Sequence, residues 1–84
     1  MTKAPKPKAG AIDRAVGQRI RLRRVLCGLS ASHLARQIGV SYQQISKYET
    51  GKDRVPASNL YRIAKLLDTT TDYYFMDVDD TGPG

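Results

Sequence analysis

The side chains best suited to hydrogen-bonding chemistry form a short polar stripe that follows Ser41. Its members repeat at the helical spacing i, i+3, i+4 and i+7: Gln43, Ser46, Lys47 and Thr50. Amide, hydroxyl and ammonium groups on one helical face can bind a polar partner, or they can simply be solvated. The spacing alone leaves both alternatives open.

Catalysis and metal binding are poorly supported by the composition. The chain has one cysteine, Cys27, and one histidine, His33, and no phosphate-binding glycine loop. We therefore expect no catalytic residue, no cofactor and no metal site, because a four-ligand zinc site needs more cysteine and histidine. The tail aspartates, Asp77, Asp79 and Asp80, are interpreted as solubilising charge.

Two short helices and a turn are expected to position the polar stripe. Small and apolar residues recur at helical spacing up to Ile38, so the sequence predicts a half-buried helix capped by Ser30. Gly39 can take a positive φ after that helix. Ser41 then starts a second helix with a capping-box sequence, in which the Gln44 side chain reaches back to the Ser41 N–H. This is the helix-turn-helix plan, whose second helix lies in the major groove of DNA, although an ordinary helical hairpin is the alternative.

Charge is unevenly distributed along the chain. The net charge is +6, but residues 1–54 hold 12 basic and 3 acidic side chains, whereas residues 55–84 hold 2 and 5. A basic surface attracts polyanions, which favours a nucleic acid as partner. No apolar run has the length of a membrane span, so we expect a cytoplasmic protein that does not contact a membrane.

The first segments of the chain are expected to support the helical pair. Residues 1–12 are predicted to be a flexible basic arm, and Asp13 is expected to cap a first helix that ends near Gly28. Its inner stripe is predicted to be Ile12, Val16, Ile20 and Cys27. A second apolar set lies on another side of this helix: Leu22, Val25 or Leu26, and Leu29. Arg19, Arg21 and Arg23 remain for solvent, a neighbouring element or phosphate.

The C-terminal segments are expected to complete the core. Pro56 fits the start of a fourth helix, and that helix repeats apolar residues at core spacing: Leu60, Ile63, Ala64 and Leu67. Thr69–Thr71 offers a cap for one further aromatic turn. Residues 13–76 are thus predicted to form one all-α domain of five helices, and residues 77–84 a disordered acidic tail.

Several segments in combination resemble the lambda-repressor/Cro-type (XRE-like) helix-turn-helix family. They are RIRLRR-x-x-x-GLS, LARQIGVS, QQISKYETG, RVPAS and LYRIAKLL, and the resemblance covers Asp13 to Phe75. It implies a five-helix lambda-repressor-like DNA-binding domain. Members of this family are mostly bacterial and phage transcription regulators that bind operators as homodimers, so double-stranded DNA is the implied partner.

The resemblance also implies which residues contact DNA. Positions expected to reach base edges are Tyr42, Gln43, Gln44 and Lys47. The chemistry agrees, because glutamine can bond to adenine N6 and N7, and lysine to guanine O6 and N7. Positions expected to contact phosphate are Ser30, Ser41, Thr50, Lys52 and Arg54.

Two further features follow from the resemblance. Arg24 and Glu49 occupy positions where the family often has a buried ion pair, so we predict that their side chains touch. Many members open the second helix with a phosphate-clamping glutamine, whereas this chain has Ala31. Ser30, Ser32 or His33 would have to substitute for it, although a lone His33 is expected on the exposed side of its helix.

The functional hypothesis is a sequence-specific regulator, expected to be a repressor, that binds an inverted-repeat operator as a homodimer. The family geometry implies dimer contacts through the last turn: Tyr73, Tyr74, Phe75 and Met76. The alternative for these residues is closure of the monomer core. Alternative functions are an antitoxin or anti-activator that mainly binds another protein, and a controller-type transcriptional activator.

Overall fold

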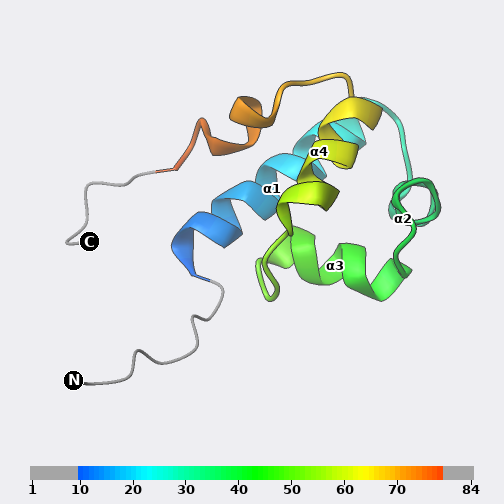
Figure 1. Cartoon of the computed structure of the whole chain (residues 1–84), viewed down its shortest axis with the longest axis horizontal. Helices are drawn as coiled ribbons and strands as arrows, with labels where there is room; N and C mark the ends of the chain where they lie inside the picture. Colours follow the sequence, from blue (N-terminus) through cyan, green and yellow to red (C-terminus); the bar gives the residue numbers. More distant parts are fainter. Residues whose placement is uncertain (1–9, 79–84) are drawn as a thin grey trace.

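The computed structural model describes residues 10–78, which form four α-helices and one short 3₁₀ helix (Figure 1). In chain order these are α1 (Ala11–Leu26), α2 (Ala31–Ile38), α3 (Tyr42–Thr50), α4 (Ala57–Leu66) and η1 (Thr71–Phe75). No strand occurs within residues 10–78, so the predicted all-α class is confirmed. The last of the five expected helices is a 3₁₀ helix. The expected arm and tail lie largely outside the described residues.

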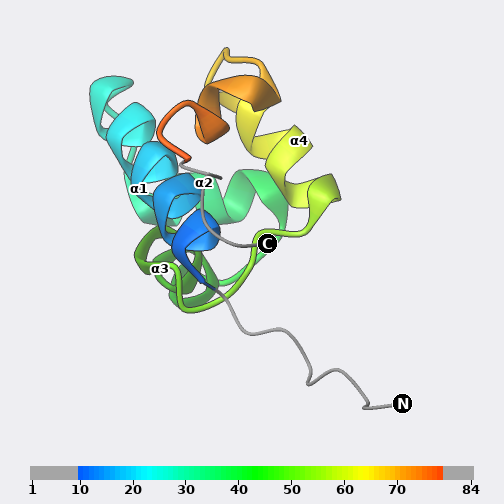
Figure 2. The same cartoon turned by 90° about the vertical axis from the view of Figure 1, so that its left-hand side faces the viewer.

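One hydrophobic core receives a buried side chain from every helix. The largest fully buried side chains are Ile20, Leu34, Ile45, Ile63, Leu67 and Tyr74. In Figures 1 and 2, α3 lies at the lower edge of the folded part, with no other helix below it. The helix is therefore held to the core on one side only.

The first helix begins three residues earlier than the sequence predicts. Its N-cap is Gly10, and Asp13 lies inside the first turn, where its carboxylate accepts a hydrogen bond from the Gly10 N–H at 2.8 Å. A carboxylate in the first turn also interacts favourably with the helix dipole. Ala11 and Ile12, which were expected in the basic arm, belong to α1.

The inner stripe of α1 is shorter than expected. Val16 and Ile20 are buried, but Ile12 is 44% exposed and Cys27 is also exposed. Ile12 lies in the first turn, which projects past the other α-helices (Figure 1), and Cys27 is the C-cap beyond the last helical turn. In the second apolar set, Leu22, Val25 and Leu26 are exposed on α1, whereas Leu29 follows the helix and packs against the core.

The backbones of α1 and α3 come very close together where the two helices cross. Gly17 is buried in α1, and a Cβ atom built on it would lie 2.1 Å from the Tyr48 carbonyl oxygen and 2.9 Å from that of Glu49. Only a residue without a side chain allows the two backbones to come this close. Gly17 therefore sets the distance of α3 from α1.

The 3₁₀ helix η1 closes the core with one of its three consecutive aromatic residues. Tyr74 is fully buried, and its hydroxyl oxygen accepts a hydrogen bond from the Thr69 hydroxyl at 2.7 Å. Tyr73 packs edge-to-face against Tyr74, with the ring centroids 5.0 Å apart. Among the four residues expected at a dimer interface, Tyr74 thus fills the monomer core, whereas Phe75 and Met76 are exposed.

Candidate nucleic-acid interface

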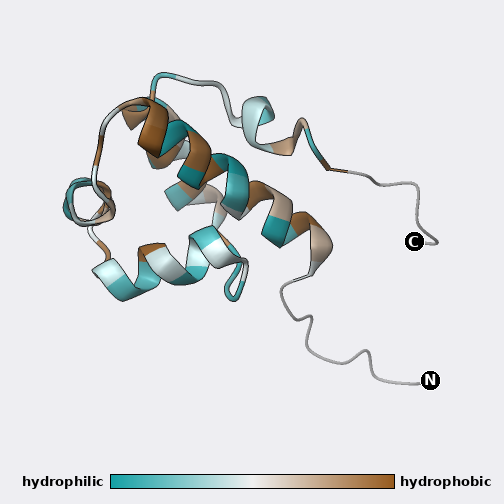
Figure 3. Cartoon of the chain, turned by 180° about the vertical axis from the view of Figure 1, so that it is seen from behind, coloured by the Kyte–Doolittle hydropathy of each residue, from teal (hydrophilic) through white to brown (hydrophobic). Residues whose placement is uncertain are grey.

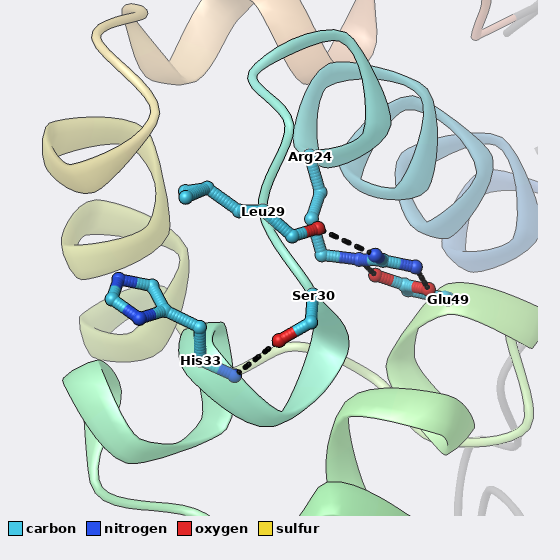
Figure 4. Close-up of polar contacts among 5 residues, drawn as sticks. All are labelled: Arg24, Leu29, Ser30, His33 and Glu49. Atoms are coloured by element: carbon cyan, nitrogen blue, oxygen red, sulfur yellow. Dashed lines mark hydrogen bonds and ion pairs between the residues drawn. The ribbon is translucent and has the colours of Figure 1, made fainter.

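The segment from α2 to α3 has helix-turn-helix geometry. Ser30 caps α2 by accepting a hydrogen bond from the His33 N–H at 3.0 Å (Figure 4). Gly39 follows α2 with a φ of 77°, so the chain turns at once. Ser41 caps α3 by accepting from the Gln44 N–H at 3.0 Å. Local sequence signals therefore determine where both helices start and where the turn lies.

The two faces of α3 differ sharply in burial. Ile45, Tyr48 and Glu49 point into the protein and are buried. The polar stripe lies on the opposite face, and its residues are all exposed: Gln43, Ser46, Lys47 and Thr50. Figure 3 shows the consequence for the ribbon, in which α3 is hydrophilic or neutral along most of its length. The stripe is thus available to a polar partner.

The exposed residues of α3 line a shallow hollow of about 280 Å³. Its lining residues are Tyr42, Gln43, Ser46, Lys47, Thr50 and Lys52. Tyr42 is 56% exposed although it is aromatic. The structure thereby brings together three of the four expected base-contacting residues and two of the expected phosphate-contacting residues.

Gln44, the fourth residue expected to contact bases, has a second role. Its amide nitrogen donates to the Asp53 carboxylate at 3.1 Å, and the side chain is only partly exposed. The expected capping box at Ser41 is therefore only half formed, because the Gln44 side chain contacts the loop after α3 rather than the Ser41 N–H. This bond ties the start of α3 to that loop.

The residues expected to contact phosphate lie at helix ends. Ser30 and Ser41 are the exposed N-caps of α2 and α3, and the Thr50 hydroxyl donates to the Ser46 carbonyl oxygen at 2.9 Å in the last turn of α3. Lys52 is exposed just beyond α3. Arg54 forms an ion pair with Asp13 at 3.4 Å, which links this loop to α1.

The predicted contact between Arg24 and Glu49 is present. The Arg24 Nε lies 2.6 Å from Glu49 Oε2 and an Nη lies 2.9 Å from Oε1, so the pair is bidentate (Figure 4). The other Nη donates to the Leu29 carbonyl oxygen at 2.8 Å. Hydrogen bonding to Glu49 raises the pKa of Arg24 above its ordinary value. Both side chains are largely buried, so this pair fixes α3 against α1.

The start of α2 lacks a long polar side chain. Ala31 is partly buried, and the Ser30 oxygen is occupied by capping. His33 is partly buried rather than exposed as expected, and its ring points away from the ion pair (Figure 4). The exposed polar side chains at this end of α2 are those of Ser30 and Ser32.

Several positioning contacts were not predicted from the sequence. The Asn59 amide donates to the Tyr48 hydroxyl at 3.0 Å and joins α4 to α3. Arg19 binds Asp77 through two nitrogens, at 2.7 and 3.0 Å, and joins the segment after η1 to α1. Neither pair has a local sequence signal, because its partners are 11 and 58 residues apart.

The family follows from a comparison of the sequence with known families. Residues 20–74, more than half of the chain, match the helix-turn-helix family HTH_3. The chain belongs to this family. The expected resemblance to lambda-repressor/Cro-type regulators is confirmed, and the family is one of transcriptional regulators rather than enzymes.

Curated relatives support the same family. The chain is 51% identical over 72 residues to an uncharacterized transcriptional regulator in the ATPase CF(0) region of Rhodospirillum rubrum, a match covering 86% of this chain and 67% of that protein. It is 43% identical over 79 residues to an uncharacterized HTH-type regulator of Sinorhizobium medicae, covering 94% and 57%. The chain thus spans between about half and two thirds of the length of the curated relatives it matches.

Solved structures share the fold of this helix-turn-helix domain. The controller protein C.AhdI from Aeromonas hydrophila superposes with a TM-score of 0.73 and 30% identity, covering 79% of this chain and 100% of that one. The P22 c2 repressor, in complex with synthetic operator 9T, gives a TM-score of 0.68 and 31% identity, covering 73% and 92%. The biofilm master regulator SinR, in complex with DNA, gives 0.64 and 30%, covering 70% and 95%.

The described residues show neither a membrane-spanning helix nor a cluster of metal ligands. Within residues 10–78, none of the helices combines the length and the apolar character needed to cross a bilayer. The same residues contain no group of three or more histidine, cysteine or acidic side chains arranged to hold a metal ion.

Proposed function

We propose that this helix-turn-helix domain is a sequence-specific repressor that inserts α3 into the major groove of an inverted-repeat operator. One observation carries the proposal: the polar stripe of α3 is exposed, while the opposite face of the same helix is fixed in the core. A helix held in this way presents its side chains to DNA without reorganising. We expect it to act in the cytoplasm, with its DNA partner.

Base recognition is assigned to residues along the exposed edge of α3. Gln43 is exposed and can bond bidentately to adenine, and Lys47 can bond to guanine O6 and N7. Tyr42 can pack against a thymine methyl group. Gln44 keeps its amide oxygen for a base edge, because only its nitrogen is engaged by Asp53.

Phosphate contacts are assigned to the ends of the two helices. Ser30 and Ser41 stand at helix N-termini, where free N–H groups attract phosphate. Thr50, Lys52 and Arg54 follow at the C-terminal end of α3 and in the next loop. These contacts would fix the register of the helix without reading sequence.

Dimerisation is assigned to the exposed end of η1. Phe75 and Met76 are 43% and 66% exposed, and Tyr73 is partly exposed beside them. Two copies related by a two-fold axis would place their α3 helices about 34 Å apart, which is one turn of DNA, on two half-sites.

The relatives support DNA binding and repression. The P22 c2 repressor was crystallised with an operator and SinR with DNA, and both are at least 30% identical to this chain over the domain. A controller-type activator is the second candidate. It is favoured by C.AhdI, a restriction-modification controller protein whose whole length matches 79% of this chain.

Selection of tight binders from random DNA duplexes tests the proposal. The wild-type chain should select a palindromic consensus, with affinity that falls steeply with salt concentration. Gln43→Ala and Lys47→Ala should each lose about 1–3 kcal/mol of discrimination at one base position while keeping nonspecific binding. Arg62→Ala on α4, which also removes an exposed polar side chain, is the matched control.

Two outcomes would count against the proposal. Failure of the wild type to enrich any consensus would favour a protein-binding function, as in an antitoxin or anti-activator. Unchanged preference in both α3 variants would remove the base-contact assignment. Transcription from a promoter carrying the selected site would separate repression from activation.

A further inference from the structure

The arginines in the second half of α1 differ in what they bind. Arg19 binds Asp77 and lies over the Tyr73 ring at 4.9 Å. Arg23 donates to the Leu67 carbonyl oxygen at 2.9 Å, and Arg24 binds Glu49. Arg21 is exposed, and within the described part of the chain it has no hydrogen bond or ion pair.

Arg21 stands beside the DNA-facing helix rather than on a remote surface. It lines a hollow of about 250 Å³ between α1 and α3, together with Arg24, Ala31, Tyr42, Ser46, Glu49 and Thr50. Three of these residues also line the hollow on the other side of α3. We call them the α3 ridge: Tyr42, Ser46 and Thr50. Arg21 thus flanks the ridge on one side, and Lys47 and Lys52 flank it on the other.

We propose that the hollow between α1 and α3 is a further phosphate-binding site, in which Arg21 holds the DNA backbone. This inference rests on the proposed function. The major groove is about 12 Å wide and is bounded by two sugar-phosphate strands, so a helix inserted in it faces one strand on each flank. Lys52 serves one flank of the α3 ridge, and Arg21 serves the flank that the expected phosphate contacts leave without a cation.

The electrostatics of the hollow favour an anion. The Glu49 carboxylate also lines it, but Arg24 binds both of its oxygens, so this carboxylate is neutralised and does not hold Arg21. The unpaired charge at the hollow is then that of Arg21. A guanidinium can donate two parallel hydrogen bonds to phosphate oxygens, which an ammonium group cannot do.

The protein surface beside Arg21 also has room for the sugar-phosphate backbone of DNA. A second hollow, of about 620 Å³, continues from Arg21 along α1 and is lined by Gln18, Leu22, Val25, Glu49 and Thr50. Gln18 is exposed and adds a neutral hydrogen-bond donor on the same side of α1. A sugar-phosphate strand can therefore approach Arg21 along α1 without displacing a helix.

Salt-dependent binding of Arg21→Gln and Arg21→Lys tests the assignment, with a duplex selected by the wild type and an unrelated duplex. Arg21→Gln should weaken binding to both duplexes by a similar factor, about three- to tenfold for each bound subunit, and should reduce the slope of log K against log salt by about 0.9 per subunit, or about 1.8 for the proposed dimer. Arg21→Lys should keep the slope but recover only part of the affinity. Lys65→Gln on α4 is the control, because it removes the same charge as Arg21→Gln. The Lys65 side chain lies over the Tyr61 ring, away from both hollows, so this variant should keep the wild-type slope.

The possible results separate this inference from the proposed function. If the wild type binds its selected duplex but Arg21→Gln changes neither slope nor affinity, the phosphate site is wrong and the proposed function stands. A change in base preference would also overturn it, because Arg21 would then act on sequence readout. If the wild type selects no duplex, the proposed function itself fails. Thermal unfolding should be unchanged in Arg21→Gln, because the wild-type side chain has no partner to lose.

Discussion

The Arg24 guanidinium connects three parts of the domain through one side chain. It binds both carboxylate oxygens of Glu49, at 2.6 and 2.9 Å, and it also donates to the Leu29 carbonyl oxygen at 2.8 Å. Glu49 belongs to α3, and Leu29 lies in the connection that leads into α2. The orientation of the helix-turn-helix unit on α1 therefore depends on this bidentate pair.

Removing one partner of this pair should be more damaging than removing both. Arg24→Met strands the Glu49 carboxylate, which is only 8% exposed, and should lower the free energy of unfolding by about 3–5 kcal/mol. The double variant Arg24→Met/Glu49→Leu should lose clearly less, because no charge is left buried. Urea unfolding of the three chains measures this difference, and equal losses in both variants would show that the pair is not a coupled unit.

Gly17→Ala should disrupt the crossing of α1 and α3. The new methyl group would meet the Tyr48 carbonyl oxygen at 2.1 Å, and that backbone atom cannot move without shifting α3. We expect a loss of about 1–3 kcal/mol in unfolding free energy and weaker DNA binding, although Gly17 lies in a different helix from the polar stripe. Ala15→Gly is the matched control for helix propensity and should cost about 1 kcal/mol or less. If Gly17→Ala were as stable as the wild type, the close packing of α1 against α3 at Gly17 would be contradicted.

The pKa of Asp77 should respond to Arg19. Two hydrogen bonds from Arg19 lower the pKa of this exposed carboxylate below its ordinary value of 3.8. Its contribution to stability should be fully present above pH 3.8 and should disappear as the pH falls through the lower folded-state pKa. NMR titration of the Asp77 carboxyl carbon measures the shift. In Arg19→Gln the pKa should rise back toward 3.8, and an unchanged value would mean that Arg19 does not hold Asp77 in solution.

Tyr74 should limit stability at high pH. Burial raises its pKa above the ordinary value of 10.0, because the phenolate would lose hydration inside the core. Because the pKa of Tyr74 is raised in the folded state, its protonated hydroxyl contributes fully to the folded state's stability below pH 10. This contribution is lost as the pH rises through the higher folded-state pKa. The wild type should therefore unfold more readily above pH 10, and Tyr74→Phe should lose less stability over the same range. Identical alkaline profiles would show that Tyr74 is not the titrating group.

The parts of the fold that depend on neighbours in sequence could be predicted. Ser30 and Ser41 cap α2 and α3, and Gly39 makes the turn between them, because caps and turns are determined within a few residues. The Arg24–Glu49 contact came from family resemblance, which places positions 25 residues apart in one register.

Contacts between distant elements could not be predicted. The close approach at Gly17 requires knowing which helix crosses α1. The sequence also leaves the direction of Tyr74 open, because three aromatic residues follow one another in η1 and a five-residue 3₁₀ helix has no repeating stripe to separate inward from outward positions. The Gln44–Asp53 bond competes with the capping box that the local sequence favours.

Amide NMR of the labelled chain, titrated with its selected duplex, tests the central claim most directly. If α3 enters the major groove, the largest shifts should fall on residues 41–50 and on the Gln43 side-chain amide, with smaller changes at Arg21 and little change along the outer face of α4 near Tyr61. Shifts concentrated in residues 73–76 or on α4, with α3 unchanged, would contradict the assignment of α3 as the DNA-reading helix.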